Sequence, residues 1–218
     1  MVGSDEPERT ISPILNQLDP ANSLTLMGLV LGFTAVIFAW NQNYELAAIC
    51  IIFSGLVDLF DGVVARQITR TDLQKGVGQQ LDSLVDLCSF GFAPAAFAYS
   101  YGLRDPGSIA ILLIYLCANA LRLAYFNCTG LTQSENQEFF TGLPVTYAAL
   151  FIPLAFTSSL VMSKEVTAIA LRITYALLAV AMLGNFKMLK LKGIWYGIFA
   201  LGAAMMIGLY AWAFWVNG

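Results

Sequence analysis

Four aspartates inside otherwise apolar segments are the residues of this chain best suited to chemistry. They are Asp58 and Asp61 in GLVDLFDGVVAR (residues 55–66) and Asp82 and Asp86 in GQQLDSLVDLCSFG (residues 78–91). Spacings of three and four residues place each pair on one helix face. Ionised carboxylates at membrane depth cost about 3 kcal/mol each or more, and they normally mark a functional site. Because oxygen ligands favour Mg²⁺, Mn²⁺ or Ca²⁺, two such faces turned together predict a divalent-cation site.

The residues between the aspartates suggest what the cations would act on. Bound cations can hold a pyrophosphate, neutralise a leaving phosphate and orient an attacking oxygen. Gly62 and Gly78 would let a nucleotide or phosphate approach the backbone closely, and Arg66 could pair with a phosphate through its planar guanidinium. The chain has no histidine, so acid–base chemistry must rely on carboxylates.

The composition is that of an integral membrane protein. Of 218 residues, 58% are hydrophobic and only 11% are charged, whereas soluble domains carry roughly 25% charged residues. The net charge is −3, and the eleven basic residues are spread along the chain. The sequence therefore lacks the clustered basic patch that is typical of nucleic-acid-binding proteins. We expect an all-α polytopic helix bundle.

Seven apolar segments are about 20 residues long, the length that spans a bilayer. They cover roughly residues 23–41, 44–65, 79–101, 108–127, 143–162, 166–187 and 194–215. We expect residues 23–218 to form a single membrane domain after an N-terminal segment, 1–22. In that segment Ile11, Ile14, Leu15 and Leu18 repeat at helical spacing, which predicts a short amphipathic helix at the membrane interface.

The basic residues predict the orientation of the chain. With the N-terminus in the cytoplasm, eight lie on the inner side and three on the outer side, as the positive-inside tendency requires. The inner set is Arg9, Arg66, Arg70, Lys75, Arg122, Lys187, Lys190 and Lys192, and the outer set is Arg104, Lys164 and Arg172. All four aspartates then lie at one depth, just below the inner headgroups. We expect a site that faces the cytoplasm, in the cytoplasmic membrane if the source is prokaryotic.

The acidic motif resembles a known family signature. Asp58-x2-Asp61-Gly62-x2-Ala65-Arg66, followed by Gly78-x3-Asp82-x3-Asp86, is similar to the motif D-x2-D-G-x2-A-R-x8-G-x3-D-x3-D of the CDP-alcohol phosphotransferases. Eleven residues rather than eight separate Arg66 from Gly78, and Lys75 stands where the usual spacing puts glycine. We infer a three-residue insertion in the cytosolic loop. The resemblance runs from the first span to at least Pro144, and it implies a six-helix core with a probable seventh span added.

Within that family, three further segments resemble phosphatidylserine synthases. They are SFGFAP (residues 89–94), LRLAYFN (121–127) and FTGLP (140–144). The second segment usually reads LRLARFN, and Tyr125 replaces its second arginine here. PANSLT (20–25) also resembles the family's approach to its first helix, which helps to hold the cytidine.

The resemblance implies roles for individual residues. The metal ligands, for one or two Mg²⁺ or Mn²⁺ ions, would be Asp58, Asp61, Asp82 and Asp86, with Asp86 also the general base. The CDP-lipid would be held by Asn22, Thr25, Asp58, Gly62, Ala65, Arg66, Gly78 and Asp82. Arg122 is the candidate for binding the serine carboxylate, with Asn127 as a polar neighbour. The substrates would be CDP-diacylglycerol and L-serine, and family members tend to be homodimers.

Two alternatives stay open at this point. A sister enzyme would use glycerol phosphate, inositol phosphate or choline as the acceptor. Beyond Arg66 and Arg122, only Arg70 and Lys75 in the loop could bind a phosphorylated acceptor, which favours an unphosphorylated one. An ion-coupled transporter could also use intramembrane carboxylates, but the sequence shows no inverted repeat.

Overall fold

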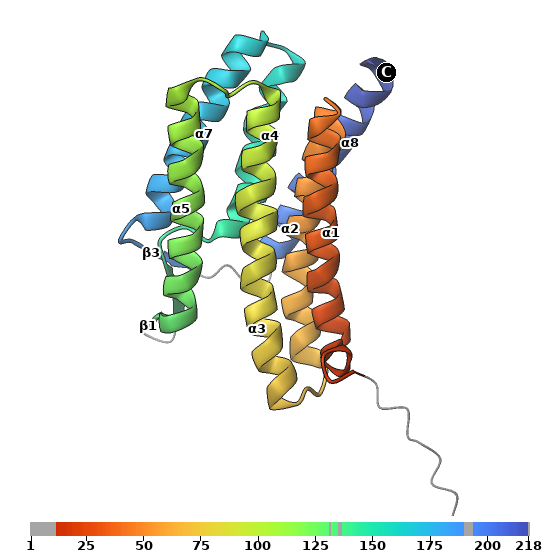
Figure 1. The fold of residues 1–218 in the computed structure, drawn as a ribbon, viewed down its shortest axis with the longest axis vertical. Coiled ribbons are helices and arrows are strands. Elements are labelled where there is room, and N and C mark those ends of the chain that lie inside the picture. Colours follow the sequence, from red (N-terminus) through yellow and green to blue (C-terminus); the bar gives the residue numbers. More distant parts are fainter. Residues whose placement is uncertain (1–11, 131, 135–136, 190–193, 218) are drawn as a thin grey trace, which may run out of the picture.

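Six long apolar helices cross the molecule, and the last of them is clearly inclined to the first (Figure 1). The computed structural model describes residues 12–130, 132–134, 137–189 and 194–217. The helices are α1 (Pro20–Trp40), α2 (Tyr44–Gln67), α3 (Asp72–Asp86), α4 (Ala93–Tyr101), α5 (Pro106–Thr129), α6 (Ala148–Phe156), α7 (Lys164–Leu183) and α8 (Ile194–Asn217). A π-helix, η2 (Leu87–Phe92), joins α3 to α4 into one crossing. The all-α membrane bundle is therefore confirmed.

The fifth predicted span, 143–162, forms a helical stretch too short to count among the six long apolar helices. The apolar helical stretch there is Val145–Leu160, which is shorter than the other six. It consists of α6 between two 3-10 turns, η3 (Val145–Tyr147) and η4 (Thr157–Leu160). Pro153 lies inside α6 and cannot donate a backbone hydrogen bond there.

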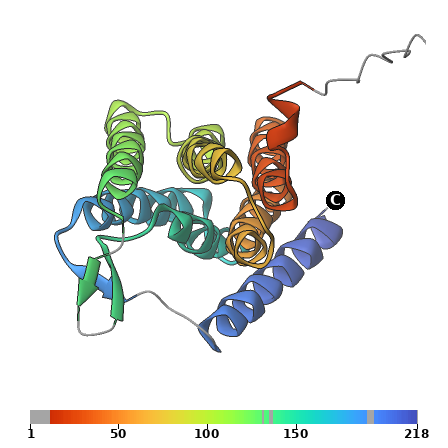
Figure 2. The same ribbon diagram turned by 90° about the horizontal axis from the view of Figure 1, so that it is seen from below.

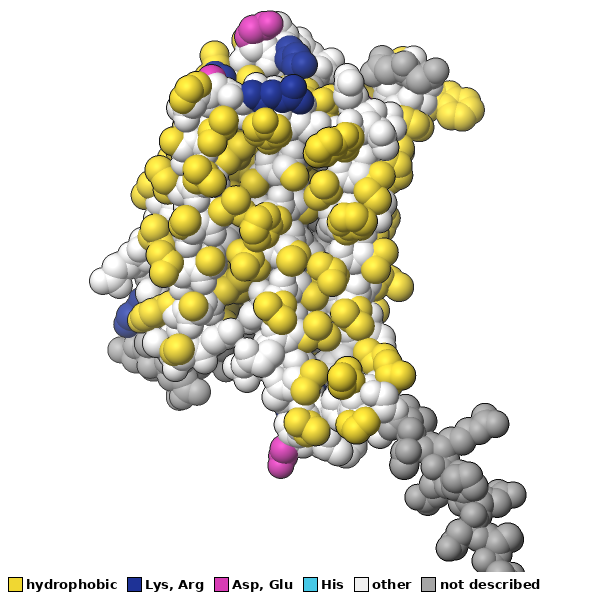
Figure 3. All heavy atoms as spheres, viewed as in Figure 1, with side chains coloured by type: hydrophobic (Ala, Val, Ile, Leu, Met, Phe, Trp, Pro, Cys, Tyr) yellow, Lys and Arg dark blue, Asp and Glu magenta, His cyan; other side chains and the backbone are white. Residues whose placement is uncertain are grey.

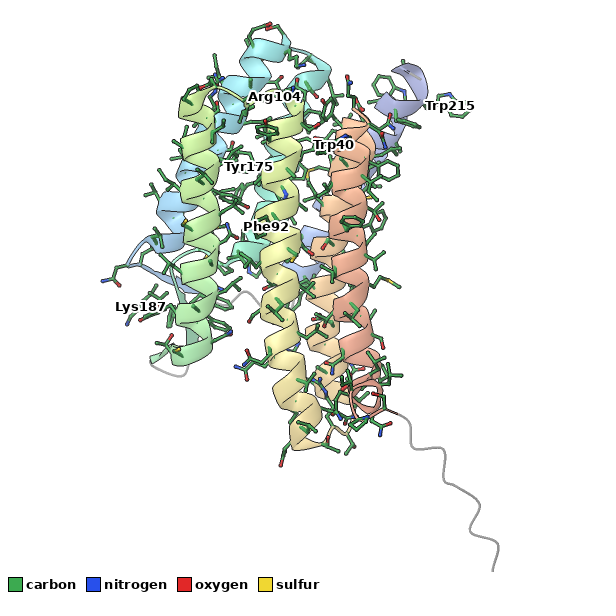
Figure 4. All side chains as sticks on the ribbon, in the orientation of Figure 1. Trp40, Phe92, Arg104, Tyr175, Lys187 and Trp215 are labelled. Atoms are coloured by element: carbon green, nitrogen blue, oxygen red, sulfur yellow. The ribbon has the colours of Figure 1, made fainter. Side chains whose placement is uncertain are left out.

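The surface of the bundle matches a bilayer. Hydrophobic side chains cover most of the face in Figure 3, and charged ones gather near its two ends. Trp40, at the end of α1, and Trp215, near the end of α8, are 80% and 85% exposed and lie at the same end of the molecule (Figure 4). Tryptophan is enriched at membrane–water interfaces, so this end is expected to lie at one membrane surface.

Helix α3 begins seven residues earlier than the predicted span. Thr71 caps it, accepting a hydrogen bond from the backbone N–H of Gln74 while the Gln74 side chain accepts from the backbone N–H of Thr71. Only residues 68–71 are left to connect α2 to α3. Residues 72–77, between Arg66 and Gly78, therefore belong to α3.

Small residues let the helices around the aspartates approach closely, as is common in membrane bundles. A Cβ added to Gly32 of α1 would lie 2.8 Å from Ser89 Oγ in η2. A Cβ added to Gly55 of α2 would lie 2.7 Å from the Cβ of Ala149 in α6. These contacts fix α2 and the α3–η2 crossing against their neighbours.

The π-helix η2 directly follows Asp86. Two buried tyrosines from other helices bind backbone carbonyls here: the Tyr115 hydroxyl donates to Phe90 O, and the Tyr175 hydroxyl donates to Pro94 O. Figure 4 shows Tyr175 and Phe92 near the mid-height of the bundle. Isolated π-turns are frequent at functional sites, and this one sets the rotation of α3 relative to α4.

A small antiparallel sheet, not predicted from the sequence, lies beside the bundle (Figure 2). Its strands are β1 (Thr132–Ser134), β2 (Gln137–Thr141) and β3 (Lys187–Leu189), in the order β1-β2-β3. Strand β3 begins at the last residue of the predicted sixth span, because α7 already ends at Leu183. Gly142, with φ of 69°, turns the chain after β2, where a Cβ would lie 2.6 Å from Met182 O.

The N-terminal segment is less regular than predicted. Among its described residues only one 3-10 turn forms, η1 (Leu15–Gln17), and Ile11 lies outside the described residues. Ile14, Leu15 and Leu18 are 80%, 55% and 48% exposed, so they are free to enter a membrane interface. Asp19 then caps α1, which starts at Pro20 and not at residue 23.

Candidate active site

Three of the predicted acidic residues converge between α2 and α3. Asp58 from α2 and Asp82 and Asp86 from α3 each place one carboxylate oxygen within 4.8 Å of the others. None of the salt bridges among the described residues involves them. Carboxylates so close together repel one another unless a cation lies among them. The donor set, made of oxygens alone, fits a Mg²⁺ or Mn²⁺ ion.

The fourth aspartate, Asp61, lies outside that group of three. Its Oδ2 accepts a hydrogen bond of 2.6 Å from Thr25 Oγ1 in α1. It still lines a cavity of about 10 Å³ together with Thr25, Asp58 and Asp86, a space of roughly one water-sized sphere. Asp61 therefore joins α1 to the acidic centre, with one oxygen already held by Thr25.

The predicted phosphate-binding face of α2 is open. A Cβ added to Gly62 would meet nothing within 4 Å. Ala65 is half-buried, and Arg66, in the last turn of α2, is exposed. Asp58, Gly62 and Ala65 are spaced four and three residues apart, so they share one helix face. This face leaves room for a ligand beside the carboxylates.

Gly78 has different surroundings, because the space above it is filled by protein. A Cβ there would collide with Arg70 Nη2 and would lie 2.6 Å from Asn22 Oδ1. Arg70 Nη2 donates to Asn22 Oδ1 over 2.5 Å, and Arg70 Nε donates to Asp19 Oδ2 over 2.7 Å. The sequence predicted for Arg70 only that it lies in the loop and could bind a phosphorylated acceptor. Its partners lie about fifty residues away in the chain, and no local pattern indicates them.

Arg122 of α5 is a buried cation without a hydrogen-bonding partner at two of its nitrogens. Its Nε and Nη2 donate to no partner among the described residues, although Arg122 is only 7% exposed. The guanidinium carbon lies 5.0 Å from the ring centre of Phe126 and 5.5 Å from that of Phe140 in β2. Asp86 is close enough for its charge to act on this guanidinium. The guanidinium edge formed by Nε and Nη2 is therefore available to bind an anion next to the acidic centre.

Asn127, the other predicted acceptor-binding residue, is already engaged. Its Nδ2 donates to Ser83 Oγ over 2.8 Å. Ser83 directly follows Asp82 in α3, so the contact ties the end of α5 to the acidic helix. Ser83 was not predicted as a site residue, and its signal in the sequence is only its place between the two aspartates of α3.

Comparison with known proteins finds one matching family and several similar proteins. The model of the family described as CDP-alcohol phosphatidyltransferase matches residues 19–216. A CDP-diacylglycerol–serine O-phosphatidyltransferase of Saccharomyces cerevisiae is 32% identical over 156 residues, covering 66% of this chain and 55% of that protein. The protein of the same name in Bacillus subtilis is 33% identical over 138 residues, covering 62% and 73%.

An archaeal relative carries a related name. The archaetidylserine synthase of Methanothermobacter thermautotrophicus is 36% identical over 132 residues, covering 59% of this chain and 54% of that protein. Several of these matches therefore span only about half the length of the relative. The similarity includes the acidic motif within the range that the family model matches.

Proposed function

Because the chain belongs to the CDP-alcohol phosphatidyltransferase family, we propose that it transfers a phosphatidyl group from CDP-diacylglycerol to the hydroxyl of L-serine. The products are phosphatidylserine and CMP. The observation that carries this proposal is the convergence of Asp58, Asp82 and Asp86 within a chain whose similar relatives are named for this reaction. The reaction belongs to phospholipid biosynthesis.

The aspartates hold the cation, and their neighbours hold the CDP moiety. Asp58, Asp82 and Asp86 supply the first ligands, and Asp61 supplies another through the oxygen that Thr25 leaves free. A bound Mg²⁺ or Mn²⁺ neutralises the pyrophosphate and its leaving group. The open face at Gly62 and Ala65 admits the phosphates, and Arg66 pairs with one of them. Asn22 and Thr25 approach the nucleotide from α1, and Gly78 of α3 supports this site by leaving room for the contact between Arg70 and Asn22.

Asp86 acts as the general base. It is buried, it belongs to the acidic centre, and it is the aspartate nearest the π-helix that positions α3. It takes the proton from the serine hydroxyl as that oxygen attacks the lipid-bearing phosphorus. A new phosphorus–oxygen bond forms while the bond from phosphorus to CMP breaks, and CMP leaves with the electron pair. Arg66 stabilises the charge that develops on CMP.

Arg122 selects the acceptor by its carboxylate. Its unpartnered Nε and Nη2 form the planar edge that binds a carboxylate through two parallel hydrogen bonds. Phe126 and Phe140 hold the guanidinium in place through their ring faces. Asn127 supports the site indirectly through Ser83. Choline has no carboxylate, so it would leave this buried cation unpaired.

The placement in the cell follows from the same proposal. Residues 23–218 form a single membrane domain, the acidic centre faces the cytoplasm, and the enzyme works in the cytoplasmic membrane if the source is prokaryotic. The bias of basic residues toward that side supports the orientation. A homodimer is proposed from the family resemblance.

One assay tests the proposed reaction against its alternatives. Purified protein in lipid nanodiscs receives CDP-diacylglycerol, Mn²⁺ or Mg²⁺ and, in separate reactions, labelled serine, glycerol phosphate, inositol phosphate and choline. We expect CMP release and a labelled lipid with serine. A labelled lipid with another alcohol alone would overturn the choice of serine. No CMP release with any acceptor would overturn the enzymatic function and favour a transporter.

A further inference from the structure

A larger cavity opens directly beside the acidic centre. It has a volume of about 220 Å³, lies between α2, α6 and α8, and includes Asp58 in its wall. Apart from Asp58 and a few hydroxyls, its lining is apolar, with Leu56 of α2, Leu150 of α6 and Phe199, Ala203 and Met206 of α8. The sequence motif accounts for Asp58 but assigns no role to this space or to α8.

The cavity is elongated along the helices. Its α2 wall runs from Asp58 to Ile52 and its α8 wall from Tyr196 to Met206, which are about 9 and 15 Å of helix at a rise of about 1.5 Å per residue. In Figure 1, α2 descends and α8 ascends, so the α2 wall rises from Asp58 and the α8 wall rises from the start of that helix. The cavity thus leads from Asp58 into the apolar part of the bundle.

We propose that this cavity holds one acyl chain of the CDP-activated lipid, an inference that rests on the proposed function. Its reactive end is polar: Asp58, Thr146 and Tyr147 lie in the lining, where the glycerol and phosphate would be. The remaining wall is hydrocarbon. An engineered apolar cavity of about 150 Å³ stays free of water and binds benzene, so a larger one with similar walls accepts an alkyl chain.

Aromatic residues are packed beyond the last α8 residue of the cavity lining, Met206. Tyr210, one turn beyond Met206 on α8, is fully buried and stacks on Phe156 at 5.8 Å between ring centres. Its hydroxyl donates to Pro153 O over 2.5 Å. This packed pair lies in the path of a chain that extends along α8 beyond Met206, so we expect longer acyl chains to fit less well.

The effect on the substrate comes from shape and not from hydrophobic transfer. Lipid tails are as apolar as the cavity wall, so moving a chain from bilayer to cavity gains little transfer free energy. A bulkier wall therefore acts by exclusion. Ala203 is the smallest side chain on the α8 wall and is 5% exposed. Leu201, two residues away, is 64% exposed on the outer face and offers a matched control.

The first test does not depend on turnover. Protein in nanodiscs is mixed with a CDP-diacylglycerol that carries a photoreactive diazirine near the end of one acyl chain, and the labelled peptides are mapped by mass spectrometry. We expect labelling of residues in the cavity wall, at Ala203 and Met206. Labelling confined to outward residues such as Leu201 and Met205 would overturn the proposal.

The second test changes the size of the cavity. Ala203→Phe should raise the KM for long-chain CDP-diacylglycerol about tenfold, as overpacking of a filled site by one large side chain implies, with a smaller effect on the dioctanoyl substrate. Leu201→Phe should leave both values unchanged. Ala203→Leu, a smaller change, covers the case in which Ala203→Phe fails to fold. Unchanged chain-length profiles in folded Ala203 variants would contradict the proposal. If even the wild type releases no CMP, the proposed function fails, while the labelling experiment still decides the occupant of the cavity.

Discussion

Arg70 donates a hydrogen bond from Nε to Asp19 Oδ2 across 2.7 Å, and so joins the loop after α2 to the residue that caps α1. The same guanidinium reaches Asn22 Oδ1 and Gln74 O. Both members of the pair are nearly buried, at 10% and 8% side-chain exposure. The two helix ends that carry the predicted nucleotide contacts are therefore held together by an arginine of the short connection between α2 and α3.

Arg70→Ala should destabilise the protein. Removing one partner of a buried ion pair leaves the other charge without compensation, which costs about 3 kcal/mol. Lys75→Ala is the control, because its pair with Asp72 lies in the same region but is exposed at 62% and 102%, where such pairs contribute about 0–1 kcal/mol. Thermal unfolding in one detergent measures both variants. Equal melting temperatures would show that the Arg70–Asp19 pair does not hold α1 to the loop.

Asp86→Asn should stop turnover and keep lipid binding. The amide cannot accept the serine proton, and loss of a general base lowers kcat by roughly 10²–10⁴. Asp72→Asn, at the exposed start of the same helix, should leave kcat unchanged. CMP release and binding of CDP-diacylglycerol are measured on each variant. An Asp86→Asn enzyme with near-normal kcat would remove Asp86 from the role of base.

Arg122→Ala should affect serine much more than the CDP-lipid. Losing a hydrogen-bonded charge pair with the carboxylate should raise the KM for serine roughly 10- to 100-fold. Arg104→Ala is a matched control, since Arg104 also lies over an aromatic ring, 5.4 Å from the centre of Tyr99. Figure 4 shows Arg104 at the opposite end of the bundle from Lys187. Lys187 belongs to β3, which pairs with the strand that holds Phe140, one of the rings beside Arg122. Kinetics with each substrate varied in turn give the two KM values. Equal increases for both substrates would indicate a structural role for Arg122.

Asp105 should make stability depend on acid pH. Hydrogen bonds from the hydroxyl and the backbone N–H of Ser108, together with Arg172, lower the pKa of Asp105 from 3.8 to about 2. A lowered pKa means that the contribution is fully present above pH 4 and is lost as the pH falls toward 2. Asp105→Asn keeps a good helix cap but cannot titrate. The difference in melting temperature between wild type and Asp105→Asn should be constant from pH 7 to 5 and shrink below pH 4. A difference that stays the same at low pH would contradict this.

The sequence was sufficient for features that depend on local composition. Apolar length identified the helices, and the i,i+3 and i,i+4 spacing predicted that each pair of aspartates shares a helix face. The structure brings Asp58, Asp82 and Asp86 together and leaves Asp61 outside that group. The start of α3 was also within reach, because Thr71 and Gln74 form a capping box whose pattern is visible in the sequence. The prediction began the span at residue 79 because it followed hydrophobicity alone.

Other features depend on contacts that no local pattern reveals. The π-helix after Asp86 is bound by Tyr115, and the start of α4 that follows it is bound by Tyr175, both from distant helices. The pairing of β2 with β3 joins Phe140 to Met188, and it shortens α7. Asp61 carries the same motif as Asp58, yet only the position of Thr25 decides that it faces α1. The π-helix, the strand pairing and the orientation of Asp61 are therefore determined by tertiary contacts.

The central claim is that Asp58, Asp82 and Asp86 together hold a divalent cation. Crystals of the protein grown with Mn²⁺ and CDP-diacylglycerol, measured at the manganese absorption edge, test it directly. The account predicts an anomalous peak about 2.2 Å from carboxylate oxygens of all three aspartates, and loss of that peak in Asp82→Asn but not in Asp72→Asn. A map without a peak between α2 and α3, from active protein, would contradict the account.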